Sequence, residues 1–338
     1  MSTEQTTPSP FLFFDTVNGY QRSAAIKAAI ELELFTALAE GRQTVGSLAE
    51  RCRASERGIR ILCDYLTVIG FLFKDKESYG LTLDSAAFLD KNSPAYMGSA
   101  VEFLLSPMLM ECFAHLTDAV REGGTALPEE GTIAPEHPVW VQFARAMAPM
   151  MMMPAQLMAK QIEMEAGRKI KVLDIAAGHG MYGITIAQHN PSAEIIALDW
   201  PNVLEVAKEN ARKAGVDDRY STIAGSAFEV DFGRHYDLVL LTNFLHHFDE
   251  ETCLKLLKKV HAALSEDGRA ITVEFVPNED RVSPPPSAMF SLVMLGSTPK
   301  GDAYTFREFE KMFADAGFRR SELHQLPPTP QQLIITYK

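Results

Sequence analysis

Apolar residues in the N-terminal part of the chain recur at a helical spacing. From Phe11 through "AAIKAAIELELFTALAEG" they repeat at about every 3.6 residues, and Gly41 ends the pattern. Thr44 and Ser55 are good capping residues, and each precedes a further short amphipathic segment. The stretch "FLFKDKESYGLTL" then has the pattern of two strands joined by a charged turn. Helices followed by such a hairpin are the order of a winged helix.

The C-terminal half changes to apolar strands that alternate with amphipathic helices. The predicted strands are "KIKVLDIA", "AEIIALD", "YSTIAG", "YDLVLLT" and "GRAITVEFV", and helical segments such as "PNVLEVAKENARKAG" follow them. The last predicted helix opens with a capping box formed by Thr305 and Glu308. Such alternation predicts a doubly wound α/β domain, whose ligand lies at the carboxyl ends of the strands.

These patterns divide the chain into four parts. Residues 1–10 are a flexible tail, residues 11–100 the winged-helix domain, residues 101–165 a helical, methionine-rich region, and residues 166–338 the α/β domain. In the third part Met150–Met153 stand in a row and cover every face of a helical turn. We interpret this part as a linker that lines an apolar substrate pocket or a dimer interface. Adaptable core packing is the alternative.

Charge and composition restrict the partners. The net charge is −12 and the isoelectric point is near 5.3, which argues against attraction to nucleic acid or anionic lipid. The second helix of the winged helix offers only Arg57 and Arg60 as outward cations, so we expect dimerisation or substrate capping rather than DNA binding.

The four cysteines lack metal-binding spacing and are typical of free thiols. With no signal peptide and no long apolar run, we expect a soluble cytoplasmic protein.

The stretch "VLDIAAGHGMYGITIAQ" follows the first strand of the α/β domain and contains the spacing G-x-G-x-x-G at Gly178, Gly180 and Gly183. Glycines let the chain turn tightly and bring backbone amides against a ligand. Asp199 ends the next strand, about 20 residues further on, where a carboxylate accepts ribose hydroxyls. Both features fit NAD, and both fit another nucleoside cofactor equally well.

Asp174 separates these two candidates. It immediately precedes the glycine-containing turn, where a dinucleotide would place its pyrophosphate and where a carboxylate would repel it. S-adenosylmethionine carries no phosphate; it has a sulfonium and an amino group, which a nearby acid favours. The sequence therefore favours S-adenosylmethionine over NAD.

The α/β part resembles the class I S-adenosylmethionine-dependent methyltransferases. The whole chain, with its winged-helix front, looks like the two-domain small-molecule O-methyltransferase family. The matching segments are "VLDIAAGHG", "ALDWPNV", "YDLVLLTNFLHHFDEETCLKLLKK", "GRAITVEFV" and "TFREFEKMFADAGF". The resemblance implies a Rossmann-like doubly wound methyltransferase domain, an N-terminal winged-helix dimerisation domain and a homodimer.

The resemblance also implies a set of residues that bind the cofactor. Ala176 replaces the first glycine of the family's glycine run, and Ser226 stands where the family usually has an aspartate for the adenine amino group. A neutral serine makes a weaker partner there than a carboxylate. The expected cofactor-binding residues are Asp174, Ala176, Gly178, Gly180, Asp199, Trp200, Ser226, Ala227, Phe228 and Asn243.

By the same resemblance His246 is the base that deprotonates the acceptor, and Glu274 is the acid that orients it. A positioning role for His246, and the capping of an amide by Glu274, are the alternatives. The family's second acid falls at Ala303, so that role is absent or moves to Asp302. The expected substrate-binding residues are Met147, Met151, His247, Met289, Phe290 and Met294. No histidine stands at a metal-ligand spacing, so we expect no metal.

The sequence thus predicts a methyltransferase that acts on a hydroxyl group of a small, largely apolar molecule, aromatic ones included. One alternative keeps the cofactor and methylates carbon or sulfur, which needs no histidine base. A second alternative is a cofactor-binding regulator without catalysis. A third, an NAD dehydrogenase, rests on the glycine spacing alone.

Overall fold

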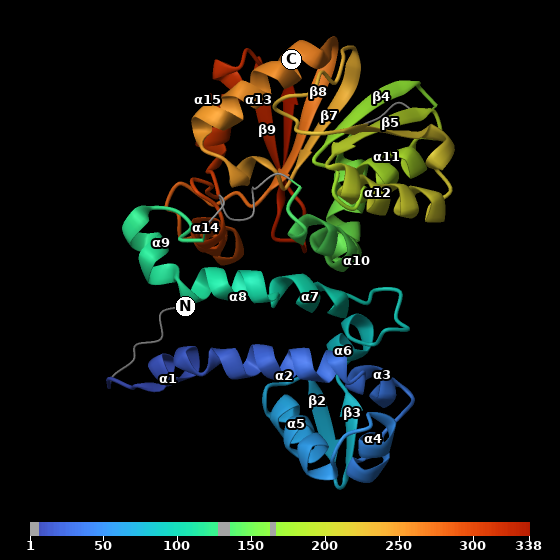
Figure 1. Cartoon of the computed structure of the whole chain (residues 1–338), viewed down its shortest axis with the longest axis vertical. Helices are drawn as coiled ribbons and strands as arrows, with labels where there is room; N and C mark the ends of the chain where they lie inside the picture. Colours follow the sequence, from blue (N-terminus) through green and yellow to red (C-terminus); the bar gives the residue numbers. More distant parts are fainter. Residues whose placement is uncertain (1–6, 128–135, 163–166) are drawn as a thin grey trace. The chain divides into compact units, whose positions relative to one another are not determined.

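The structure is a computed structural model that describes residues 7–127, 136–162 and 167–338 (Figure 1). It divides into two compact units, one ending at Leu105 and the other beginning at Ser106. The first unit contains α1 (Phe11–Val17), α2 (Gly19–Glu31), α3 (Leu34–Ala39), β1 (Gln43–Thr44), α4 (Val45–Arg51), α5 (Glu56–Val68), β2 (Leu72–Asp75), β3 (Ser78–Leu81), α6 (Leu83–Phe88), η1 (Gly98–Ala100) and α7 (Val101–Leu104).

Within this unit the winged-helix pattern forms where its capping residues predict it. Thr44 Oγ1 accepts the amide of Ser47, and Ser55 Oγ accepts the amide of Gly58. Strands β2 and β3 form the predicted hairpin, and β1 completes a small sheet in the order β1-β3-β2. The expectation of one helical run to Gly41 is wrong in detail. The chain breaks at Asn18 and again at Glu33, whose φ of 54° is left-handed and ends the path of α2.

The second unit contains α8 (Pro107–Ala114), α9 (Leu116–Glu122), α10 (Val139–Gln161), β4 (Ile170–Ile175), α11 (Met181–His189), β5 (Ala193–Asp199), α12 (Pro201–Lys213), η3 (Asp217–Arg219), β6 (Tyr220–Ala224), β7 (Tyr236–Thr242), η4 (Leu245–His247), α13 (Glu250–Ala263), β8 (Leu264–Glu274), α14 (Pro285–Ser297), α15 (Phe306–Asp315), β9 (Arg320–Gln325) and β10 (Gln332–Tyr337). Its seven strands form one sheet in the order β6-β5-β4-β7-β8-β10-β9. Strands β4 to β8 are parallel, whereas β10 is antiparallel to both β8 and β9.

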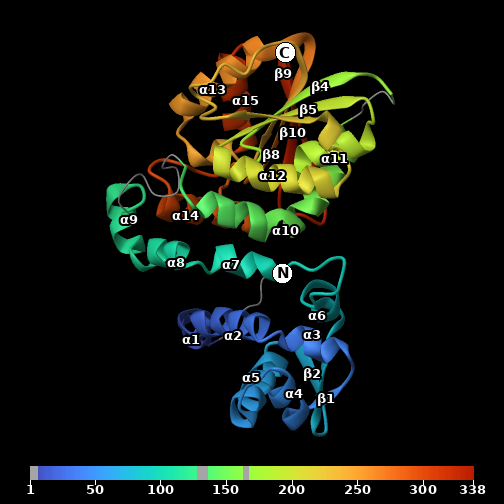
Figure 2. The ribbon, with the colours of Figure 1, turned by 45° about the vertical axis from the view of Figure 1, so that its right-hand side comes forward.

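Helices cover both faces of this sheet. Helices α11 and α12 lie on one face with α10 packed against them, and α13 and α15 lie on the other, as Figure 2 shows. A large core forms between α13, α15 and the strands, with Leu256, Phe309 and Phe313 fully enclosed. In α10, Met151 faces the interior, whereas the side chains of Met152 and Met153 are exposed. The methionine row therefore serves more than one environment.

Candidate active site

After β4 the chain turns through residues 176–180 into α11, at the carboxyl edge of the parallel strands. Ala176, Gly178 and Gly180 have φ angles of 53°, 56° and 75°, a region that glycine enters without strain. A Cβ atom on Gly180 would lie 2.6 Å from the hydroxyl oxygen of Tyr220. Both the backbone and the lack of space therefore require glycine at position 180.

Asp199 ends β5 and holds this turn. Its Oδ2 accepts the amide of Gly178 at 2.8 Å, and its Oδ1 accepts the amide of Trp200 at 2.7 Å. Burial raises the pKa of this carboxyl to about 6, so it is ionised at neutral pH. Each oxygen has a further lone pair, with which the carboxylate can accept ribose hydroxyls.

Asp174 lies beneath the turn, within β4, and only 1% of its surface is exposed. Its Oδ2 accepts the amide of Gly183, in the first turn of α11, at 3.1 Å. Its Oδ1 has no hydrogen-bond partner among the described residues. Burial raises the pKa of this carboxyl to about 7. The sequence predicts that Asp174 acts on the cofactor through its charge. In the structure Oδ2 binds the amide of α11, which leaves only Oδ1 for this role.

The segment after β6 lies next to Asp199. The amide of Gly225 donates to the Asp199 carbonyl at 3.0 Å, and Ser226 Oγ accepts the amide of Phe228 at 3.2 Å. Ala227 is buried in the core, and the half-buried ring of Phe228 packs against it. Trp200 instead packs into a small apolar cluster between α10 and α12, beside Ala144, Val203 and Val206.

His246 and Glu274 form a buried pair at the ends of β7 and β8. Nδ1 of His246 lies 2.5 Å from Oε2 of Glu274. Oε1 of the same carboxylate accepts the amides of Phe244 and Leu245, each at 2.9 Å. The sequence left two roles open for Glu274, orienting the histidine and capping an amide. The structure shows both contacts at once.

Two further contacts fix the turn that carries His246. The thiol of Cys253 lies 3.2 Å from the Leu245 carbonyl, and the hydroxyl of Tyr304 donates to the Phe248 carbonyl at 2.6 Å. The position of the family's second acid holds no carboxylate, and the neighbouring Asp302 has another partner. Ala303 is buried, and Asp302 forms an ion pair with Arg281 at 3.2 Å.

Two aromatic rings contact the His246 imidazole, and two more pack behind them. The His247 ring lies 4.2 Å from the imidazole, and Phe290 meets it edge-on at 4.8 Å. Phe275 stacks on Phe290 at 4.0 Å, and Trp140 meets His247 at 5.2 Å. Burial, together with the neighbouring His246, holds the pKa of His247 well below its usual range, so His247 stays neutral.

Asn243 follows β7 in a left-handed conformation, with a φ of 51°. Its Nδ2 donates to the hydroxyl of Tyr182 at 3.2 Å, and the sulfur of Met151 lies 3.8 Å from both groups. The buried Oδ1 of Asn243 has no partner among the described residues. It is therefore an acceptor available to a ligand.

The remaining methionines occupy different surroundings. Met147 and Met294 are buried, each with 4% of its surface exposed, whereas Met289 is 66% exposed and does not join the enclosed group. The sequence missed Trp140, Tyr182 and Phe275. Phe275 directly follows Glu274 and Tyr182 directly precedes Gly183, so their places beside motif residues could have indicated that they belong to the site. Trp140 lies in a helix that no motif marks.

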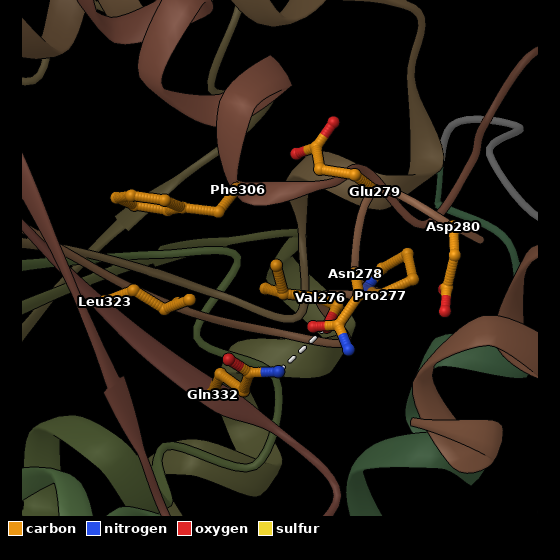
Figure 3. Close-up of a pocket in the computed structure, with 8 residues that line it drawn as sticks. All are labelled: Val276, Pro277, Asn278, Glu279, Asp280, Phe306, Leu323 and Gln332. Carbon is orange, nitrogen blue, oxygen red and sulfur yellow. Dashed lines mark hydrogen bonds between the residues drawn. The ribbon is translucent and has the colours of Figure 1, made fainter. Parts of the chain in front are cut away.

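Figure 3 shows the residues that line a separate cavity of about 420 Å³. The segment after β8 lines it together with Phe306, Leu323 and Gln332, and Gln332 Nε2 donates to the Val276 carbonyl at 2.8 Å. None of the expected site residues lines this cavity.

Within the described ranges, no group of three or more His, Cys, Asp and Glu side chains is arranged to hold a metal ion. Nor does any helix in the described part of the chain have the length and apolarity needed to cross a membrane.

A glycine-containing turn beside the carboxylate of Asp199 fits S-adenosylmethionine, and the unpartnered buried oxygens of Asp174 and Asn243 suit its cationic groups. The histidine–carboxylate pair suits an acceptor that must lose a proton. Fold and site together define the class: a methyltransferase that uses S-adenosylmethionine.

Comparison with known proteins gives the family. The model of the O-methyltransferase domain matches residues 113–319, and the model of the O-methyltransferase dimerisation domain matches residues 14–91. The chain belongs to the O-methyltransferase family. The predicted Rossmann-like fold, the enzyme class and the cofactor are thereby confirmed, and the NAD interpretation of the glycine turn is excluded.

Individual relatives match nearly the whole chain. The 3-hydroxy-5-methyl-1-naphthoate 3-O-methyltransferase of Streptomyces sahachiroi is 28% identical over 91% of this chain and 89% of its own length. A protein of Nostoc punctiforme, provisionally described as an O-methyltransferase, has a crystal structure with a TM-score of 0.94 and 61% identity, covering 98% of this chain and 100% of that one. Human N-acetylserotonin methyltransferase in complex with S-adenosylmethionine has the same fold, with a TM-score of 0.84 and 24% identity, over 100% of this chain and 99% of that one.

Proposed function

We propose that the enzyme methylates a hydroxyl group of a small, largely apolar aromatic molecule, with His246 as the base. The contact between His246 Nδ1 and Glu274 Oε2, at 2.5 Å, carries this proposal. A carboxylate at Nδ1 makes that nitrogen the donor and leaves the lone pair on Nε2. Nε2 is then the atom that takes the acceptor's proton.

The pair of His246 and Glu274 gives the acceptor's proton a destination. The acceptor O–H bond breaks, its proton moves to Nε2, and the resulting imidazolium is stabilised by the Glu274 carboxylate. S-adenosylmethionine, when bound, supplies the methyl group. His247 stays neutral and lies 4.2 Å from His246, so it adds an aromatic wall and no competing charge.

The rings around His246 support an aromatic acceptor. Phe290, Phe275, His247 and Trp140 present faces and edges against which a planar molecule can pack. The relative named for a hydroxynaphthoate agrees with this choice. We assign the acceptor side to Met147, Met151, His247, Phe290 and Met294, and leave out Met289 because its side chain is exposed.

We assign the cofactor side to the glycine turn and to the ends of β5, β6 and β7. Asp199 would hold the ribose, Ser226 to Phe228 the adenine, and Asn243 a donor group through its unpartnered oxygen. The full set is Asp174, Ala176, Gly178, Gly180, Asp199, Trp200, Ser226, Ala227, Phe228 and Asn243. Trp200 belongs to it through its backbone amide, which donates to Asp199, and its ring packs between α10 and α12.

We further propose a homodimer. The match to a dimerisation domain supports it, and so does a group of apolar side chains on α1 and the start of α2 that the single chain leaves exposed. These residues are Phe11, Leu12, Phe13, Phe14, Val17 and Tyr20. Light scattering during size-exclusion chromatography tests this state, and a monomer would refute it.

The four free thiols support a reducing compartment such as the cytoplasm.

An acceptor screen tests the proposed activity. The purified enzyme is incubated with S-adenosylmethionine and a panel of hydroxynaphthoates and other phenols, with matching anilines, thiophenols and thioethers. Mass spectrometry and NMR then locate the new methyl group. Methylation on oxygen supports the proposal, and methylation only on sulfur, carbon or nitrogen would overturn it.

A further inference from the structure

Lys259 of α13 donates to three backbone carbonyls of the segment that follows β6. Its Nζ lies 2.8 Å from the oxygen of Ala227, 2.9 Å from that of Phe228 and 3.2 Å from that of Val230. The same ammonium group lies 4.9 Å from the centre of the Phe232 ring. An ammonium group has three N–H donors, so one short segment uses all of them.

The site of Lys259 is unfavourable for a charge that lacks partners. Burial lowers the pKa of Lys259, whereas Lys255, one turn earlier in α13, is exposed and pairs with Glu251 at 2.8 Å. Lys259 is held by carbonyl dipoles instead of a carboxylate. Three charge-assisted hydrogen bonds to one segment give it a defined position, which a flexible surface lysine does not have.

The carbonyls of residues 227, 228 and 230 need donors from outside the segment, because the segment's own amides bind other groups. The amide of Gly225 donates to the backbone carbonyl of Asp199, and the amides of Glu229 and Val230 both donate to the Ser226 carbonyl at 3.0 Å. Lys259 satisfies those outward carbonyls together and so fixes the path from Ser226 to Val230.

That path also carries an aromatic contact to the catalytic turn. The ring of Phe228 meets the ring of Phe248 edge-on at 5.0 Å and lies 6.4 Å from that of Phe244. Phe244 and Phe248 flank the turn that carries His246. Phe228 belongs to the segment, whereas the histidine–glutamate pair meets the segment through these ring contacts, so a shift of the segment acts on the cofactor wall directly and on the pair indirectly.

We propose that Lys259 is a positioning residue of the cofactor site, which acts by holding residues 225–230 in the conformation that receives the adenine. This inference rests on the proposed assignment of that segment to the adenine. Lys259 acts on the cofactor only through the segment's carbonyls and the Phe228 ring. Its loss should therefore raise the KM for the cofactor and spare the rate at saturation.

The test compares Lys259→Met with Lys258→Met, a neighbouring exposed lysine on the same helix. Binding of S-adenosylhomocysteine is measured by calorimetry, and kcat and the KM of S-adenosylmethionine by steady-state kinetics. For Lys259→Met we expect the Kd and the KM to rise about tenfold or more, with kcat within about threefold of wild type. Lys258→Met should behave as wild type. Lys259→Arg, which keeps a charged multiple donor, should recover part of the affinity.

The outcomes separate this inference from the proposed function. If the wild-type enzyme does not bind S-adenosylhomocysteine, the assignment of the site itself fails. If wild type binds and Lys259→Met binds equally well, or loses kcat with its KM unchanged, the positioning role is wrong. Should Lys259→Met not fold, Lys259→Gln, which keeps two N–H donors, is measured in its place against the same criteria.

Discussion

One carboxylate, that of Glu274, holds both the ring of His246 and the turn that carries it. Oε2 lies 2.5 Å from His246 Nδ1, while Oε1 accepts the amides of Phe244 and Leu245 at 2.9 Å. The turn and the imidazole each offer donors, and only a group with two acceptor oxygens satisfies both. The orientation of the base is thus coupled to the backbone at the end of β7.

The first prediction concerns Glu274→Gln. An amide has one acceptor oxygen, so it must give up either the Nδ1 proton of His246 or the amides of the turn. If it faces Nδ1 with its NH₂ group, the imidazole changes tautomer and Nε2 can no longer accept a proton. We expect kcat to fall by about 10²- to 10⁴-fold. The KM for S-adenosylmethionine should change little, and a variant with wild-type kcat would show that the pair does not matter to catalysis.

The second prediction concerns Asp174 and the stability of the cofactor-free protein. Burial raises its pKa to about 7 in the folded state, above the unfolded value of about 3.9. The stability that this group contributes is therefore present below about pH 4 and lost as pH rises towards 7. Asp174→Asn does not ionise, so it should become more stable than wild type over this range, by up to about 4 kcal/mol.

Thermal denaturation at several pH values checks the role of Asp174. The melting temperatures of Asp174→Asn and wild type should be close near pH 4, separate up to pH 7, and stay separated by a constant amount above it. A difference that does not depend on pH would contradict the raised pKa. The same variant should bind S-adenosylmethionine more weakly than wild type at pH 8, because it lacks the buried charge that favours a cation.

The third prediction compares two glycines with similar backbone angles. Gly180 has a φ of 75° and Gly215 a φ of 67°, but a Cβ at Gly180 would lie 2.6 Å from Tyr220, whereas a Cβ at Gly215 meets nothing within 4 Å. Gly215→Ala should cost about 1–2 kcal/mol from backbone strain alone. Gly180→Ala should cost about 1–3 kcal/mol more and weaken cofactor binding. Urea denaturation measures the difference, and equal losses would show that the contact with Tyr220 relaxes freely.

Much of the fold could be predicted because its signals are local. The caps at Thr44 and Ser55 and the box at Thr305 form as their residue types indicate. The breaks at Asn18 and Glu33 could not be predicted, because the apolar spacing continues across them while the backbone does not.

The candidate site, like the fold, has contacts that the sequence predicts and contacts that it does not. Glu274 ends β8 and His246 lies in the turn after the neighbouring strand β7, so topology brings them together. The contacts of Oε1 with the turn depend on the path of residues 243–247, which no sequence period encodes. The same holds for Lys259, whose partners are backbone carbonyls and leave no trace in residue types.

The role of His246 as the base is tested most directly by methyl transfer in the variant His246→Ala. With a phenolic acceptor identified by the screen and S-adenosylmethionine at saturation, the rate of formation of the O-methyl product is measured against wild type. We predict a fall of about 10²-fold or more near neutral pH, because no group then removes the hydroxyl proton, and a partial recovery at high pH where the phenol ionises by itself. A variant that transfers methyl groups to the same oxygen at the wild-type rate across the pH range would contradict this account.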